Sequence, residues 1–327
     1  MKHPKSRKLI VLESILRRLP ETESEFQFYK EMYTIHNKGH LGEQLVKSMW
    51  KELNPPSPHY LLHNYEAVNH AGNTHQIDTI LLTPHFIWLI EVKNISGKID
   101  IDESKHQLIR TNFDGTIDAF KNPIAQIKRH YHFLRDRLRE ININLPIEYA
   151  IIVVNDSTII GSVPKDTPIF HASGLQMELE KITNKHSKRK ITSHDVERIK
   201  VELTNLYHRK DWKPKLNPNK LRKGVLCKKC DFKNVMVWNH GYFKCPVCEF
   251  KSNDSLYEAM KDYRYLINEW ISNSELRDFL KVESRHAAKR ILKKLNMVHT
   301  GAYRNRKYNI PEIFDMEKLD ERDRYNK

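Results

Sequence analysis

An almost unbroken apolar run extends from Thr79 to Ile90, and its polar interruption falls around Pro84 and His85. This pattern predicts two strands that turn back on each other. Opposed residues in such a hairpin have position numbers with a constant sum, so a bend between Pro84 and His85 places Asp78 opposite Glu91. The fixed φ of Pro84 favours a four-residue loop over a two-residue turn, and both loops have the same centre. The predicted register is therefore independent of the loop.

Strand and helix patterns alternate along the first two thirds of the chain. Residues 65–68 predict a first strand, and the apolar run 149–154 predicts a central strand that is buried on both faces. Asn122 and Pro123 predict a helix start, and further helices are expected at 10–19, 26–35, from about Gly42, and at 195–207. The predicted fold class is α/β, a mixed central sheet flanked by helices. Three of these helices have an apolar stripe that is expected to face the core. The stripe is Leu41, Leu45, Met49 and Leu53 in the helix near Gly42; Ile124, Ile127, Tyr131, Leu134 and Leu138 in the helix that begins at Pro123; and Val196, Ile199, Leu203 and Leu206 in the helix at 195–207.

From about Ser255 the pattern resembles a winged helix-turn-helix. One helix is predicted at 257–270, a second is capped by Ser274, a third is capped by Ser284, and residues 297–310 are expected to form a two-stranded wing. Nine Lys and Arg residues against one Glu between 281 and 310 suit phosphate contacts. The alternative is a small helical docking module with a solvated basic face, which binds a partner protein. The candidate nucleic-acid contacts are Arg285, Lys289, Lys293, Arg304, Arg306 and Lys307.

The whole chain is basic. Its 327 residues contain 56 Lys and Arg against 41 Asp and Glu, a formal charge of +15, which favours an anionic partner such as DNA. A soluble basic protein without such a partner is the simpler alternative. Residues 209–223 carry seven basic residues against one Asp and no regular period, so we expect a linker with affinity for polyanions or an ordinary solvated hinge. Since no run of about 18 apolar residues and no signal-peptide pattern occur, we expect a cytoplasmic protein without a membrane partner.

All four cysteines fall in one segment. Cys227 and Cys230, and Cys245 and Cys248, form two C-x-x-C pairs separated by fourteen residues. Such pairs close tetrahedrally on one Zn²⁺, and four sulfur ligands leave no open position, so the expected metal is structural. Two disulfides are the rival interpretation, which a reducing cytoplasm disfavours.

Charged residues collect at the end of the predicted hairpin. Glu91 and Lys93 share one face of their strand while Val92 points to the other, and the register brings Asp78 beside Glu91. Opposed Cβ atoms are roughly 5 Å apart, close enough for two carboxylates to share a divalent cation. On spacing alone, however, a half-buried hairpin with charged ends is the commoner structure.

The surrounding residues resemble the nuclease-related domain, NERD, a branch of the PD-(D/E)XK nuclease-like superfamily, over roughly residues 37–156. Residues 39–43, which end in Glu43, resemble its glycine-glutamate motif; 76–78 resemble its metal-binding aspartate motif; and 90–93 resemble its E-x-K strand. Residues 97–99, which begin with Gly97, come after this strand as they do in the family. Asn122-Pro123 with Gln126 resemble a later signature. A tryptophan expected after Gly97 is absent, which predicts a variant loop over residues 100–120. The expected organisation is an N-terminal helical extension at 1–36, the nuclease-like domain at 37–208, a linker at 209–223, a zinc ribbon at 224–254, the winged-helix-like domain at 255–318 and a polar tail at 319–327.

The resemblance implies a restriction-endonuclease-like core and a Mg²⁺- or Mn²⁺-dependent deoxyribonuclease. In that hypothesis Asp78, Glu91 and the Val92 carbonyl bind the metal, and Lys93 orients the attacking water or stabilises the transition state. Glu43 holds the metal's hydration or a second ion, and Gln126 orients a phosphate or a water. The alternatives for single residues are a helix-dipole role for Glu43 and a solvated Gln126. For the whole protein, the alternative is a catalytically inert zinc-containing DNA-binding or regulatory protein. His75 is expected to be a surface residue.

Overall fold

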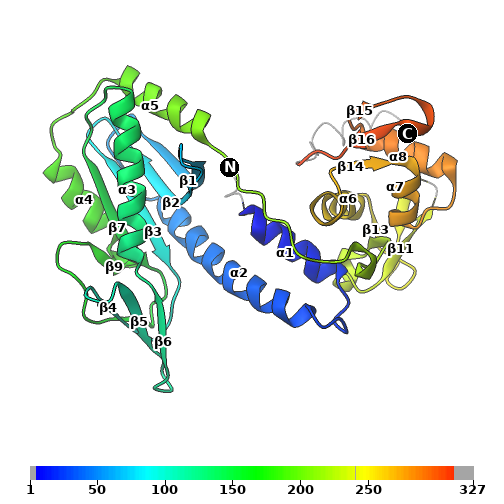
Figure 1. The fold of residues 1–327 in the computed structure, drawn as a ribbon, viewed down its shortest axis with the longest axis horizontal. Helices are drawn as coiled ribbons and strands as arrows, with labels where there is room; N and C mark the ends of the chain where they lie inside the picture. The colour runs from blue at the N-terminus through cyan, green and yellow to red at the C-terminus, as the bar shows by residue number, and fades with distance from the viewer. Residues whose placement is uncertain (1–4, 240, 313–327) are drawn as a thin grey trace. The chain divides into compact units, whose positions relative to one another are not determined.

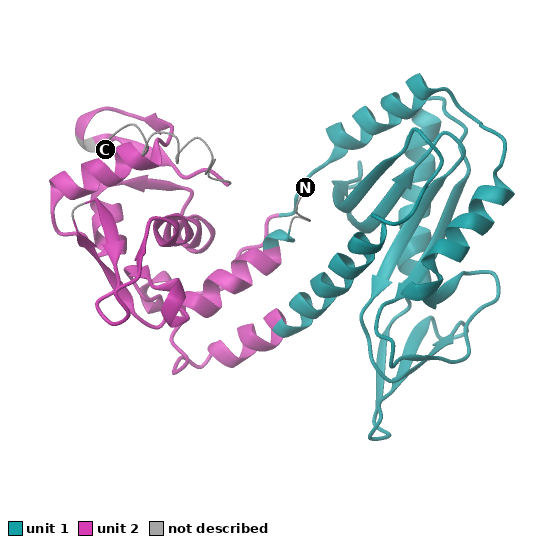
Figure 2. Ribbon diagram, turned by 180° about the vertical axis from the view of Figure 1, so that it is seen from behind, with its two compact units in different colours: residues 1–7, 34–210 teal, residues 8–33, 211–327 magenta. Residues whose placement is uncertain are grey.

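The computed structural model describes residues 5–239 and 241–312, apart from the side chain of Arg304. The chain divides into two compact units, which are coloured separately in Figure 2. The first contains residues 1–7 and 34–210, and the second contains 8–33 and 211–327. The predicted tail at 319–327 and the last residues of the predicted domain at 255–318 lie outside the described residues.

The first unit is built on a five-stranded mixed sheet in the order β1-β2-β3-β7-β9, which agrees with the predicted fold class (Figure 1). β1, β2 and β3 pair antiparallel, whereas β3, β7 and β9 pair parallel. The bounds are Tyr60–Val68 for β1, Thr74–Leu82 for β2, Ile87–Lys93 for β3, Ile147–Val153 for β7 and Ile169–His171 for β9.

The predicted hairpin register is confirmed. Thr79 pairs with Ile90, Ile80 with Leu89 and Leu82 with Ile87, each pair with the expected constant sum. The turn between the strands is held by Thr83, whose backbone N–H donates to the carbonyl of Phe86 over 3.1 Å. Because register decides which face each side chain takes, this agreement fixes the surroundings of Asp78 and Glu91.

Helices cover both faces of the sheet. On one face, α3 (Pro123–Glu140) and α5 (Ser193–Leu206) pack on strand residues such as Ile80 and Leu89. On the other face, α2 (Phe26–Met49) and α4 (Leu175–Lys185) pack on residues such as Trp88 and Ile90. Asn122 caps α3 as predicted, with its Oδ1 accepting from the Ile124 backbone N–H over 2.9 Å.

Helix α2 departs from the prediction. The two helices expected at 26–35 and from about Gly42 are one continuous helix, in which Gly39 and Gly42 occupy internal positions. The expected inward stripe is wrong at its first half, since Leu41 and Leu45 are 57% and 47% exposed. The residues that pack on the sheet are instead Val46 and Trp50. The buried residue Val46 lies one position after the exposed Leu45, and Gly42 meets Val154 and Asn94 on the same side of the helix.

The predicted variant loop at 100–120 is a second, smaller sheet in the order β6-β5-β4-β8. Its strands β4, β5 and β6 lie between β3 and α3 in the chain, whereas β8 follows β7 (Figure 1). The bounds are Lys98–Asp102 for β4, Gln107–Thr111 for β5, Ile117–Lys121 for β6 and Ile159–Ile160 for β8.

The second unit combines the C-terminal modules with residues from the N-terminus. A four-stranded sheet in the order β10-β11-β12-β13 carries the cysteines, and it is followed by three helices and a three-stranded sheet in the order β14-β16-β15. The third helix is capped by Ser284 as expected, but the second is capped by Ser272 rather than Ser274. The bounds are Val225–Leu226 for β10, Val235–Asn239 for β11, Tyr242–Lys244 for β12, Lys251–Ser252 for β13, Asp254–Leu266 for α6, Trp270–Ser272 for β14, Asn273–Leu280 for α7, Arg285–Leu295 for α8, His299–Thr300 for β15 and Lys307–Asn309 for β16.

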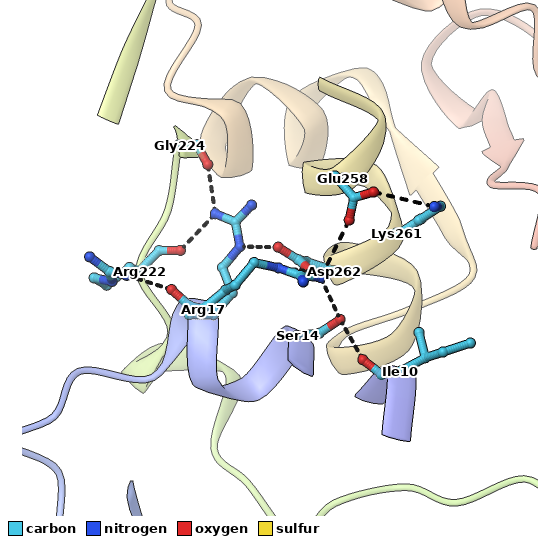
Figure 3. Close-up of polar contacts among 9 residues, drawn as sticks. Ile10, Ser14, Arg17, Arg222, Gly224, Glu258, Lys261 and Asp262 are labelled. Atoms are coloured by element: carbon cyan, nitrogen blue, oxygen red, sulfur yellow. Dashed lines mark hydrogen bonds and ion pairs between the residues drawn. The ribbon is translucent and has the colours of Figure 1, made fainter. Parts of the chain in front are cut away.

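A buried ion network joins α1 (Arg7–Arg18) to α6 inside this unit (Figure 3). Arg17 and Arg18 both donate to the carboxylate of Asp262, with Arg18 Nε 2.8 Å from Oδ2 and Arg17 Nη2 2.6 Å from Oδ1. Arg18 also donates to the carbonyls of Arg222 and Gly224, which lie just before the first cysteine. The predicted linker is likewise not wholly solvated, since Trp212 and Leu216 pack with α1. Within the described residues, no helix is long and apolar enough to span a bilayer.

Candidate active site and metal site

Four polar side chains meet where β3 ends. Asp78 on β2 and Glu91 on β3 are 8% and 3% exposed, so both carboxyl groups are withdrawn from water. Lys93, two residues further along β3, places its Nζ 2.6 Å from Oε1 of Glu91 and 3.4 Å from Oε1 of Gln126 on α3. The structure thus brings together the residues that the sequence singled out from two strands and a helix.

The surroundings of this cluster favour the protonated form of its two carboxyl groups. Burial raises the pKa of Asp78 well above its usual value, and the nearby charges of Glu91 and Glu43 raise it further. Burial also raises the pKa of Glu91, although Lys93 opposes the shift. For Lys93, burial is outweighed by Glu91, which accepts its hydrogen bond, and by Asp78, so its pKa is raised and the ammonium is retained. Buried carboxylates with raised pKa values are typical of sites that bind a cation or handle protons.

Glu43 approaches the cluster because α2 lies very close to the sheet edge. A Cβ built on Gly42 would lie 2.9 Å from Cγ2 of Val154 and 3.0 Å from Cβ of Asn94. Asn94 also donates to the Lys38 carbonyl over 2.8 Å, which ties the same helix to the end of β3 one turn before Gly42. A side chain at residue 42 would push the helix away, so the glycine sets the distance of Glu43 from the carboxylates.

Three histidines near the cluster were missed or misjudged from sequence. His40, one turn before Glu43 on α2, is 8% exposed, and its Nδ1 lies 3.8 Å from Oε2 of Glu43. His75 is not a surface residue: it is 2% exposed, and its Nδ1 lies 3.1 Å from Nδ1 of the equally buried His130 on α3. Burial lowers the pKa of His75 to about 4 and that of His130 to about 3, so both rings are neutral at physiological pH. His130 is not among the inward positions predicted for this helix, yet it is buried against His75 of β2.

The four cysteines are positioned to bind a metal ion. Their sulfur atoms all lie within 4.8 Å of one another, with Cys227 3.6 Å from Cys248 and Cys230 3.9 Å from Cys245. Four Zn–S bonds of about 2.3 Å in a tetrahedron give sulfur separations of about 3.8 Å. All four are free thiols, so the disulfide interpretation is not supported.

The candidate nucleic-acid residues lie on one helix and on the loop between two strands. Arg285, Lys289 and Lys293 on α8 are exposed, while Ala288 and Ile291 of the same helix are buried. Arg306 and Lys307 are exposed at the start of β16, and the side chain of Arg304 lies outside the described residues. Arg290 is a further exposed basic residue of α8 that the four-residue spacing did not select.

Comparison with known proteins gives a family match inside the first unit. Residues 38–154 match the model of the nuclease-related domain, NERD. The chain therefore contains a nuclease-related domain, and Glu43, Asp78, Glu91, Lys93 and Gln126 all fall within it.

An uncharacterized protein of Bacillus anthracis is 36% identical over 93 residues, which are 28% of this chain and 43% of that protein. The chain thus spans less than half the length of this relative. No solved structure matches the chain.

Proposed function

We propose that the protein is a metal-dependent nuclease that hydrolyses phosphodiester bonds in DNA. One observation carries the proposal: Asp78 and Glu91, both buried and repelling each other, lie beside a charged Lys93 in a nuclease-related domain. Two such carboxylates are costly to bury unless a cation or a proton offsets their charge. A purely structural site gains nothing from that cost.

The donor set fits a hard dication. Asp78, Glu91 and the carbonyl of Val92 are all oxygen donors, which Mg²⁺ and Mn²⁺ prefer. Bound there, the ion would polarise the scissile phosphate and lower the pKa of a coordinated water.

The other residues act through position and charge. Lys93 is held between Glu91 and Gln126, so its ammonium orients the attacking water or stabilises charge that develops on the phosphate. Gln126 supports Lys93 and orients a phosphate oxygen or a water from the start of α3. Glu43 holds the metal's hydration or a second ion from α2.

The second unit holds the substrate in this proposal. The four thiolates bind one structural Zn²⁺, which stabilises a ribbon too small to bury a sufficient core of its own. The winged-helix-like module presents the basic residues of α8 and of the β15–β16 loop to DNA phosphates. The binding affinity is therefore expected to fall steeply with salt.

The test is cleavage of plasmid and linear DNA by the purified chain, with Mg²⁺, Mn²⁺ or EDTA. Asp78→Ala and Lys93→Ala should each abolish EDTA-sensitive cleavage while leaving DNA affinity in EDTA within about threefold of wild type. Asp166→Ala, which changes an exposed carboxylate of the same unit, should cleave normally. Cleavage that persists in both site variants would reject the proposal, and tight DNA binding without any cleavage would support the inert regulatory alternative.

A further inference from the structure

The loop between β15 and β16 carries an aromatic ring that the proposed function does not use. This β15–β16 loop, residues 301–306, contains Tyr303, which is 96% exposed, the highest value among the large apolar residues that the structure describes. A single exposed apolar side chain is ordinary on a protein surface. The backbone and the charges around Tyr303, however, are not.

Tyr303 adopts a left-handed backbone conformation. Its φ is 48°, a region in which the Cβ of any residue other than glycine meets the neighbouring backbone, so a bulky side chain occupies it at a cost in free energy. Strain of this kind persists only where the surrounding chain imposes it, and it is frequent at binding sites.

The chain around Tyr303 imposes this conformation. Gly301 has a φ of 73°, and a Cβ built on it would lie 2.6 Å from the carbonyl oxygen of Asn305. The N–H of Asn305 donates to the carbonyl of Ala302 over 3.1 Å. The loop therefore closes tightly on its own backbone, which requires glycine at residue 301 and presents Tyr303 from a defined turn.

The loop is anchored to the core that also holds α8. Met297 and Ile310, on either side of the two strands, are buried in the same core cluster as Ala288 and Ile291 of α8. The strands themselves pair through Thr300 and Lys307 directly at the loop. The loop and the basic helix thus belong to one packed module.

The surroundings of Tyr303 are strongly basic. Residues 284–311 contain eight Lys and Arg residues and no Asp or Glu. Within the described part of the chain, the exposed side chains of Arg306 and Lys307 form no ion pair. Cations that are free to contact phosphates, next to an exposed aromatic ring that can stack on a base, are the combination that binds single-stranded nucleic acid.

A ring of this kind distinguishes unpaired from paired bases. Inside a duplex both faces of each base are covered by its neighbours, whereas an unpaired base offers a face to an aromatic side chain. The lysines and arginines contact phosphates of either form, since these contacts carry no information about the bases. A preference for an unpaired stretch must therefore come from Tyr303.

We propose that Tyr303 stacks on an unpaired base, so that the second unit recognises DNA in which a single-stranded stretch adjoins a duplex. This inference rests on the proposed function, since it assumes that the basic residues of this unit bind DNA phosphates. One such stack changes affinity by about 5- to 150-fold.

The test measures binding by the full chain in EDTA, so that it is independent of cleavage. Two DNAs share one duplex and carry tails of equal length, made of thymidines in one and of abasic sites in the other, so the phosphate charges are identical. Wild type should bind the thymidine tail about 5- to 150-fold more tightly. Tyr303→Ala should bind both tails equally, with an unchanged slope of log affinity against log salt because the ring is uncharged. Tyr303→Trp should keep the preference, and so should the control Phe113→Ala, which removes an aromatic ring of the first unit that is 74% exposed.

A further variant separates stacking from a structural role. Tyr303→Gly removes the ring and also relieves the left-handed strain, which offsets the greater freedom of glycine in the unfolded chain. It should lose the tail preference and unfold at a temperature close to that of wild type. A clearly lower unfolding temperature with an unchanged tail preference would give Tyr303 a structural role and overturn the inference.

The outcomes also distinguish this inference from the proposed function. Equal binding of the two tails by wild type, or a tail preference that survives in Tyr303→Ala, overturns the stacking even if Mg²⁺-dependent cleavage is observed. An equal loss of affinity for fully paired DNA in Tyr303→Ala also overturns it, because the ring would then contact a groove of the duplex. A tail preference that depends on Tyr303, without any cleavage, would leave the stacking standing and remove the nuclease.

Discussion

The backbone N–H of Val92 donates to Oδ2 of Asp78 over 2.8 Å, so the two strands of the central hairpin are tied through a side chain at the point where the proposed metal would bind. This bond holds the carboxylate in place and partly offsets the raised pKa of Asp78. The residue that the sequence suggested as a carbonyl ligand is thus also the donor that orients its neighbour.

Gly42 should control activity through the position of Glu43. Gly42→Ala would place a Cβ against Val154 and Asn94, so we expect a loss of about 1–3 kcal/mol in stability and a larger relative loss of cleavage. Gly39→Ala is the matched control, because a Cβ there meets nothing within 4 Å and alanine favours the helix by about 0.5–1 kcal/mol. Urea denaturation measures the stability of each variant, and cleavage rates measure its activity. Equal behaviour of the two variants would show that the close approach of α2 is unimportant.

The pair of His75 and His130 should make the protein sensitive to acid. Both pKa values are lowered in the folded state, to about 4 and about 3, so the unfolded chain binds more protons once the pH falls below about 6.5. Stability should therefore fall as the pH drops from 7 toward 4, by about 2 kcal/mol per histidine at pH 5. The double variant His75→Phe with His130→Leu should show a flatter dependence of unfolding free energy on pH. Replacing the exposed His59 by Leu should leave the slope as in wild type.

The chain should bind one metal ion, and this binding should require the cysteines. Cys230→Ser or Cys245→Ser should lower the zinc content, measured by elemental analysis, from one equivalent toward zero. The same variants should lose the cooperative unfolding of the second unit, because Cys227 and Cys245 belong to its core cluster. Full zinc retention in both variants would contradict the four-thiolate site.

Asp262 should be essential to the second unit. Asp262→Ala leaves Arg18, which is 1% exposed, without its carboxylate, and breaking such a buried pair costs about 3–5 kcal/mol. The exposed pair of Lys223 and Asp278 provides the control, and Asp278→Ala should change stability by less than about 1 kcal/mol. Thermal unfolding distinguishes the two. Comparable small losses in both variants would mean that the network contributes little.

The exposed cations of α8 should set DNA affinity and its salt dependence. Lys289→Glu and Lys293→Glu should each weaken binding and reduce the slope of log affinity against log salt by about one. Lys200→Glu, on the exposed side of α5, should leave the slope unchanged. A slope unaffected by the α8 changes would favour the docking-module alternative.

Local pattern was sufficient for those features that depend on neighbours in the chain. The hairpin register follows from alternation and the bend at Pro84, the Asn122 cap from its side chain, and the cysteine site from spacing. Features that depend on a distant contact were not predictable in this way. Gly42 inside α2 and the burial of His75 against His130 each need a partner more than 50 residues away. The small sheet likewise depends on a distant contact, since its strand β4 pairs with β8 at Ile159–Ile160.

The bond between Arg18 and Asp262 joins residues 244 positions apart, and it has a consequence for synthesis. At about 5–20 residues per second, a ribosome needs roughly 12 to 50 s to reach Asp262 after Arg18. Residues 34–210 emerge in that interval and can fold first, while α1 waits without its buried partner. A premature stop between residues 210 and 262 would therefore release a product that contains residues 34–210 but leaves Arg17 and Arg18 of the amino-terminal helix without the carboxylate of Asp262.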